Sequence, residues 1–218
     1  MDDFLSILKE SSATIEIEKS KFISYAVPVE TEAEAIDFIN EIKKKNYNAT
    51  HNVSVYSLRS GNNLRRYSDD GEPSGTAGMP TLGVIQNKNL MDICLVTTRY
   101  FGGIKLGAGG LVRAYAESAN ACLSASKIIK YEKMTHYILT VSYDLFNSLL
   151  YLLKTKDILV GETTYMENVS ISIYLREIEK NLLTELIDMS ASTIQIKENS
   201  TRYIACEDNK ILSVKELI

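Results

Sequence analysis

The sequence predicts an α+β protein of two domains, and two observations support this. The first half of the chain alternates single strands and helices, whereas the second half has a strand–helix–strand–strand–helix–strand order. The charge balance changes at the same place: residues 1–130 hold 15 basic and 15 acidic side chains, but residues 131–218 hold 9 basic and 13 acidic ones. We therefore expect an N-terminal domain over residues 1–130 and a C-terminal domain over residues 131–218.

Composition limits the class of protein. The chain has 218 residues, of which 45% are apolar and 24% charged, so it can build a buried core. Its apolar runs are far shorter than the ~18–20 residues of a membrane span. The start "MDDFLSILKE" lacks the basic region of a signal peptide and is interpreted as an amphipathic first helix. We expect a cytoplasmic protein with no membrane contact.

Cysteine and histidine usage gives no metal pattern. The three cysteines and two histidines form no C-x-x-C pair and no Cys/His spacing typical of zinc sites. The cysteines are expected to be small buried apolar residues in a reducing compartment. No cofactor is predicted.

The first half alternates strand-type and helix-type segments. The helix after the first strands has Thr31 as its N-cap and Glu34 three residues on, which is a capping box. Residues 59–67 are expected to form a turn-rich loop. The expected strands cover residues 14–29 (interrupted at 19–21), 50–58 and 91–100. The expected helices cover residues 31–45 and 110–129, and a further helix is expected to start between residues 76 and 80.

The second half is expected to be a ferredoxin-like domain, because its order is βαββαβ over about 75 residues. Asp144 is expected to cap the first of its two helices. The expected bounds are strands over residues 135–143, 158–165, 168–175 and 193–207, and helices over 144–157 and 176–190. The acidic charge of this half argues against nucleic-acid binding over the whole surface, so any such contact should come from a local patch in the first half.

An acidic loop, "DDGEPSGTAG" over residues 69–78, carries three carboxylates at Asp69, Asp70 and Glu72. The loop could contact a ligand or a partner, one or two of its carboxylates could hold Mg²⁺, or Asp69 could act as a general base. We favour ion pairing with a basic loop further along the chain, because opposite charges lower the cost of partly burying one another. No residue is assigned as catalytic or as a metal ligand.

The basic loop lies in "TRYFGGIKLGAGGLVRAY", residues 98–115, with cations at Arg99, Lys105 and Arg113. A glycine-rich entry to a helix leaves backbone N–H groups free at the positive end of the helix dipole, which suits an anion such as a phosphate, a carboxylate or a nucleic-acid backbone. The alternative is a purely structural role, in which the glycines allow tight turns and close packing. The segment has no Walker or dinucleotide-binding pattern. The glycines at the helix entry are Gly107, Gly109 and Gly110.

Three further residues in or near these loops are candidates for partner contact. His51 begins a strand, where a lone histidine is more often a structural residue than a base. The other two are in the acidic loop. They are Ser74 and Thr76.

Four segments resemble the IMPACT family, including its bacterial YigZ-type members. They are "KSKFISYAVPV", "ATHNVSVYSL", "YSDDGEPSGTAGMP" and "VTTRYFGGIKLGAGGLVRAY", and the resemblance covers about residues 15–125. The order and spacing of two long motifs make it specific. Two departures are Val53, where many members have cysteine, and Ala108, where threonine is common; they weaken a thiol-based role and remove a hydroxyl ligand.

The resemblance implies an N-terminal α/β domain of the ribosomal-protein-S5-domain-2-like fold and a C-terminal domain similar to domain V of elongation factor G. Eukaryotic relatives regulate translation by binding an activator of a starvation-response kinase, and bacterial relatives look associated with nucleic acid or the ribosome. We therefore expect a non-enzymatic binding protein that contacts RNA, the ribosome or a translation-associated protein through the basic loop, with a small anion as a further possible ligand. The alternative is an enzyme that acts on a small phosphorylated or carboxylated metabolite between the two loops.

Overall fold

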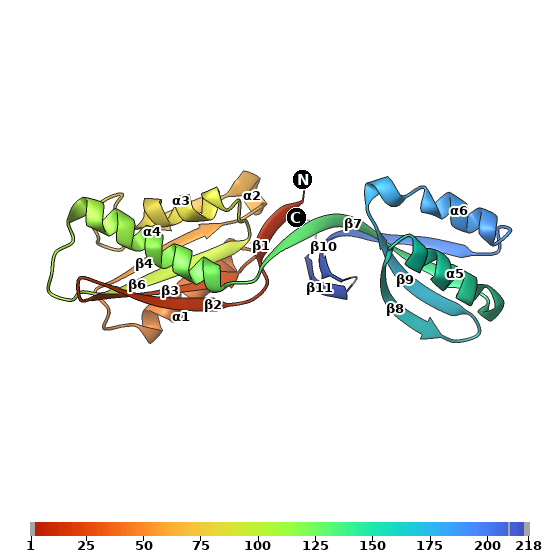
Figure 1. Ribbon diagram of the computed structural model, residues 1–218, viewed down its shortest axis with the longest axis horizontal. Helices are drawn as coiled ribbons and strands as arrows, with labels where there is room; N and C mark the ends of the chain where they lie inside the picture. Colours follow the sequence, from red (N-terminus) through yellow and green to blue (C-terminus); the bar gives the residue numbers. More distant parts are fainter. Residues whose placement is uncertain (1–2, 209, 216–218) are drawn as a thin grey trace. The chain divides into compact units, whose positions relative to one another are not determined.

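The computed structural model describes residues 3–208 and 210–215. The chain divides into two compact units between Ile129 and Lys130, and Asp3 belongs to the second unit. The elements of each unit are labelled in Figure 1. No helix in the described part of the chain is both long enough and apolar enough to cross a membrane.

The N-terminal unit is built on an antiparallel sheet whose described strands run in the order β2-β3-β6-β4-β5. The central strand β6 contains a continuous apolar run and is buried along almost its whole length, which is typical of a strand covered on both faces. Within it, Cys94 is fully buried. The strands are β2 (Ser11–Ile17), β3 (Ser20–Pro28), β4 (His51–Ser57), β5 (Arg65–Ser68) and β6 (Ile93–Tyr100).

Helices cover both faces of this sheet, which explains the apolar character of β6 (Figure 1). Cys94 and Val96 point to the face covered by α1, while Ile93 and Leu95 point to the face covered by α3 and α4. The Thr31 hydroxyl accepts from the Glu34 N–H, which confirms the predicted N-cap. The helices are α1 (Glu32–Lys45), the single turn α2 (Ser60–Asn63), α3 (Gly78–Asn87) and α4 (Gly107–Ala125).

Two expectations for the N-terminal unit were wrong. The predicted first helix is a strand, β1 (Phe4–Ile7), because its backbone pairs at long range: the Met91 N–H donates to the Leu5 carbonyl at 2.9 Å. The predicted loop over residues 59–67 contains α2 and most of β5, which pairs with β4. All four residues of β5 are exposed, so it shows no alternation of apolar and polar residues that would reveal a strand.

The second unit has the strand order β11-β10-β7-β9-β8, and β7, β8, β9 and β10 give the ferredoxin-like arrangement. Helices α5 and α6 pack on one face of this sheet around Leu149, Leu186 and Ile171. The elements are β7 (Ile128–Val141), α5 (Tyr143–Thr155), β8 (Leu159–Tyr165), β9 (Val169–Leu175), the 3₁₀ turn η1 (Glu177–Glu179), α6 (Leu182–Met189), β10 (Gln195–Glu207) and β11 (Lys210–Lys215).

The second unit also departs from expectation in detail. Ser142, and not Asp144, is the N-cap of α5, and Asp144 lies in the first turn, where a carboxylate favours the helix dipole. Strand β11 was not predicted; it pairs with β10 as the second arm of a hairpin. The two-domain α+β class is nevertheless confirmed, with an S5-domain-2-like N-terminal unit and a ferredoxin-like C-terminal unit.

Candidate functional site

The acidic and glycine-rich loops lie at the same end of the N-terminal sheet. Strand β6 ends at Tyr100, and its antiparallel neighbours β3 and β4 begin there, so that Arg99 pairs with Phe22 on one side and with His51 on the other. The turn between β2 and β3 is at this end too, because a Cβ on Gly102 would lie 2.0 Å from the carbonyl group of Lys19. We call this region the loop end of the sheet.

The Asp69 side chain organises the acidic loop by accepting hydrogen bonds from backbone N–H groups of the loop. Its carboxylate accepts from the N–H groups of Gly75 (2.8 Å), Ala77 (3.2 Å) and Gly78 (2.7 Å). It therefore satisfies free N–H groups at the start of α3, as an N-cap residue does. Both oxygens are engaged, so the geometry supports a structural role for Asp69 more than a role as base.

Asp70 joins the acidic loop to two other elements. One carboxylate oxygen forms an ion pair with Lys43 Nζ of α1 at 2.8 Å, and the other accepts from the Asn52 N–H of β4 at 2.7 Å. The Asp70 carbonyl oxygen lies 2.7 Å from His51 Nδ1. His51 and Asp70 thus fix the loop against β4, which is the structural role that a lone histidine most often has.

Glu72 and Arg99 form the one ion pair that joins the two predicted loops within the described residues. Glu72 Oε1 lies 2.7 Å from Arg99 Nη1 and accepts from the Tyr115 hydroxyl of α4 at 2.7 Å. Arg99 is only 5% exposed and Glu72 only 7%. Burial, followed by the hydrogen bond to Glu72, raises the pKa of the Tyr115 hydroxyl, so Tyr115 remains a donor.

Arg99 is consequently not part of the accessible cationic surface that the sequence suggested. Its guanidinium also approaches Ser20 Oγ (3.4 Å) and lies over the rings of Phe22 (5.4 Å) and Phe101 (5.5 Å). A charge held in this way positions its neighbours instead of contacting a ligand directly.

The other two cations of the basic loop are accessible. Lys105 and Arg113 are exposed and form no ion pair with any described residue. Arg113 lies four residues after Gly109 in α4, so both occupy the same side of the helix.

Helix α4 begins at Gly107, three residues before the predicted start, and no side chain caps it. Gly107 has φ +67°, a left-handed conformation that favours glycine. A Cβ on Gly109, by contrast, would meet no atom within 4 Å. The first turn is therefore open, and its N–H groups have no side-chain acceptor in the described structure.

The remaining candidates divide into one buried and two accessible residues. Thr76 is buried, and its hydroxyl donates to the Pro73 carbonyl at 2.7 Å. Ser74 and Gly110 are at least partly accessible; Leu106 Cβ limits the space at Gly110, where an added Cβ would lie 3.0 Å from it. Within the described residues no group of three or more His, Cys, Asp or Glu side chains is placed to hold a metal ion.

Sequence reasoning missed Lys19, Phe101 and Tyr115. Lys19 belongs to a turn far away in the chain, and only the close approach at Gly102 reveals that it shares the loop end. Phe101 was within the basic motif, but the sequence did not show that it is 47% exposed. Tyr115 ends the basic motif, but the sequence did not show that its hydroxyl donates to Glu72.

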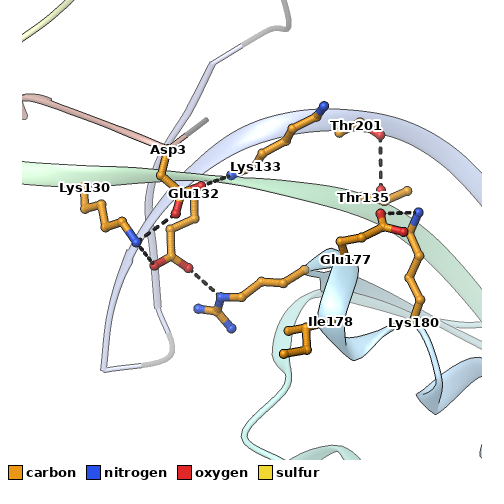
Figure 2. Close-up of a pocket in the computed structure, with 10 residues that line it drawn as sticks. Asp3, Lys130, Glu132, Lys133, Thr135, Glu177, Ile178, Lys180 and Thr201 are labelled. Carbon is orange, nitrogen blue, oxygen red and sulfur yellow. Dashed lines mark hydrogen bonds and ion pairs between the residues drawn. The ribbon is translucent and has the colours of Figure 1, made fainter. Parts of the chain in front are cut away.

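A second candidate site, a charged cleft of about 880 Å³, lies within the C-terminal unit. Figure 2 shows the Lys130 amine between the carboxylates of Asp3 (2.8 Å) and Glu132 (3.0 Å). Arg176 Nε approaches Glu132 at 2.5 Å, and Lys180 pairs with Glu177 at 2.7 Å. Because these cations are neutralised by adjacent carboxylates, the cleft is better explained as an ion-pair network than as an anion site.

Fold and loops together define a two-domain α+β protein whose N-terminal unit presents a glycine-rich, basic helix entry. A model described as the Impact N-terminal domain matches residues 18–123, and one described as a domain of unknown function (DUF1949) matches residues 139–192. A Bacillus subtilis protein named IMPACT family member YvyE is 38% identical over 212 residues, which are 97% of this chain and 98% of that protein. The chain belongs to the IMPACT family.

Two further similarities cover most of the chain. IMPACT family member YigZ of Escherichia coli is 29% identical over 195 residues, covering 88% of this chain and 93% of that protein. A crystal structure of a hypothetical protein superposes with a TM-score of 0.60 at 27% identity, covering 92% of this chain and 98% of the other. The similarity therefore extends through both units.

Proposed function

We propose that this protein is a non-enzymatic, cytoplasmic binding protein that acts in the regulation of translation and contacts RNA, free or in the ribosome, through one face of its N-terminal unit. This loop face consists of Lys19, Phe101, Lys105, the first turn of α4 and Arg113. The connection with translation comes from the role that the family resemblance implies. The RNA contact comes from the geometry of the loop face.

One observation carries the RNA contact: Lys105 and Arg113 are exposed cations without an ion pair among the residues that the structure describes, and they lie next to an uncapped helix start. Free N–H groups at the positive end of a helix dipole and flanking cations are the groups that bind phosphate oxygens. The open space at Gly109 lets a phosphate approach the backbone closely.

The acidic loop supports binding more than catalysis. The carboxylates of Asp69 and Asp70 are engaged by backbone N–H groups and Lys43, and Glu72 is engaged by Arg99 and Tyr115. These contacts give the carboxylates of the acidic loop a structural role, because they hold β4, β6 and α4 together next to the loop face.

The test is RNA binding at low salt by the full chain, measured by fluorescence anisotropy with a labelled single-stranded oligonucleotide and by co-sedimentation with ribosomes. With two or three phosphate contacts the slope of log K against log salt should be about −1.5 to −2. Arg113→Glu should weaken binding markedly and reduce the magnitude of the slope by about 0.7, the loss of one phosphate contact on a single strand.

The matched control is Lys9→Glu, the same charge change at an exposed lysine of the same unit. Lys9 precedes β2, whose other end carries the Lys19 turn, so it lies away from the loop end. Absence of RNA and ribosome binding at low salt, or equal effects of the two substitutions, would contradict the proposal. Capture of a protein partner that survives nuclease treatment, without RNA binding, would also contradict it.

A further inference from the structure

Phe101 is an aromatic ring that the fold holds partly in solvent. It follows directly after β6 and is 47% exposed. Its backbone is fixed, because its N–H donates to Thr50 Oγ1 at 3.1 Å while the Thr50 N–H donates to the Arg99 carbonyl at 2.9 Å. A single exposed aromatic residue is common on protein surfaces, so its surroundings have to decide whether it has a role.

The ring of Phe101 is supported by a buried cation. The Arg99 guanidinium carbon lies 5.5 Å from the ring centroid, within the range of a cation–π contact. Arg99 is itself held by Glu72 and by the ring of Phe22. The exposed ring is thus anchored to a buried polar cluster of the N-terminal unit, which reduces the side-chain entropy that remains to be lost on binding.

Two exposed cations belong to the chain segments next to the ring. Lys105 follows it by four residues, and the turn that carries Lys19 packs against Gly102, the residue next to Phe101. An aromatic platform with flanking positive charge is the combination by which proteins bind unpaired nucleotides: the ring stacks on the base and the cations meet the phosphates.

We infer that Phe101 is a stacking site for an unpaired nucleobase, and that the RNA bound by the loop face is single-stranded at this point. This inference rests on the proposed function. It adds a ligand class, because bases within a duplex are stacked on one another and cannot offer a face to Phe101.

The experiment compares the full chain with Phe101→Leu, using a single-stranded RNA that contains one 2-aminopurine and the same RNA annealed to its complement. Leucine keeps an apolar side chain and all charges but removes the ring. We expect Phe101→Leu to weaken single-strand binding about 5- to 100-fold and to abolish the change in 2-aminopurine fluorescence, with the salt slope unchanged. Binding of the duplex should be weaker than that of the single strand and insensitive to the substitution.

The control variant is Tyr151→Leu, which removes a more exposed ring from α5 and should leave binding unchanged. Circular dichroism and urea unfolding verify that both variants fold. If the chain binds RNA in an Arg113-dependent way but Phe101→Leu has no effect, or the duplex binds as tightly, the stacking inference is wrong and the proposed function stands. If the unsubstituted chain binds neither RNA nor ribosomes, both are wrong.

Discussion

The contacts of one buried carboxylate, that of Glu72, hold three elements together. Glu72 belongs to the acidic loop, Arg99 to β6 and Tyr115 to α4, and both partners lie 2.7 Å from the same carboxylate oxygen. A buried charge in this position is tolerated only while its partners remain, since an isolated buried ion costs several kcal/mol.

We therefore predict that Glu72→Gln destabilises the N-terminal unit by about 3 kcal/mol, because it leaves Arg99 buried without a counter-charge. Urea unfolding monitored by circular dichroism measures the change. Glu16→Gln, the same substitution at an exposed position of β2, should cost less than about 0.5 kcal/mol. Equal effects of the two substitutions would show that the pair contributes no net stability.

Residue-level prediction from sequence reached the right motifs but not their contacts. Opposite charges in the two loops suggested ion pairing, and one such pair exists, between Glu72 and Arg99. Among three carboxylates and three cations, nothing in the sequence selects that pair, because the choice depends on the register that places Arg99 beside Phe22 and His51. Asp69 pairs with backbone N–H groups instead, which charge counting does not consider.

At the scale of elements, the first turn of α4 contains a glycine with no packing reason to be one. Gly109 lies within the helix, and a Cβ there would meet no atom within 4 Å. A glycine inside a helix costs about 0.5–1 kcal/mol relative to alanine. Its presence is explained if a ligand has to approach the backbone at this turn.

We predict that Gly109→Ala raises the free energy of unfolding by about 0.5–1 kcal/mol and lowers RNA affinity several-fold, so that stability and binding change in opposite directions. Gly83→Ala is the matched control, because Gly83 lies within α3 and its Cβ would also meet no atom within 4 Å. It should give a similar stabilisation without any loss of affinity. The same anisotropy titration and urea unfolding measure both variants, and unchanged RNA binding by Gly109→Ala would contradict the prediction.

The ion-pair network of the charged cleft should make the C-terminal unit sensitive to acid. Burial alone would raise the pKa values of Asp3 and Glu132, but Lys130, with Arg176 at Glu132, outweighs it and lowers both below their ordinary values of 3.8 and 4.5. A carboxyl group with a lowered pKa stabilises the fold above its ordinary pKa and loses this contribution as the pH falls through the lowered value.

We predict that the stability of the C-terminal unit falls between about pH 5 and pH 3, and that Glu132→Gln reduces this pH dependence. Urea midpoints measured across that range, with a probe in the C-terminal unit, give the slope. Glu167→Gln, at an exposed turn residue with no ion pair among the described contacts, should leave the slope unchanged. If Glu132→Gln keeps the full slope, the network is not its source.

At the scale of the whole molecule, each unit has its own hydrophobic core. Leu95 is fully buried in the N-terminal unit and Leu149 in the C-terminal one. We propose that the two units unfold separately, with the boundary near residue 130. Leu95→Ala and Leu149→Ala should each cost about 2–5 kcal/mol in their own unit. Hydrogen exchange followed by mass spectrometry should show faster exchange only in the substituted unit; acceleration in both would contradict separate unfolding.

Global architecture was the most predictable level, for a physical reason. The βαββαβ order and the continuous apolar run of β6 reflect burial patterns that local sequence encodes directly. The errors lie where long-range pairing decides: β1 forms because its backbone meets Met91, and β5 because it pairs with β4. The loop face depends on another long-range approach, that of the Lys19 turn to Gly102, so the sequence supplied Lys105 and Arg113 but not Lys19.

The depth of Cys94 in the central strand has a practical consequence. Burial raises the pKa of its thiol to about 12, and burial also raises the pKa of the half-buried Cys206 thiol in the other unit. Alkylating reagents attack the thiolate, so Cys94 can react only when its sheet opens. The rate at which a maleimide modifies the Cys94 thiol therefore reports how often the N-terminal sheet opens to solvent, without any engineered label.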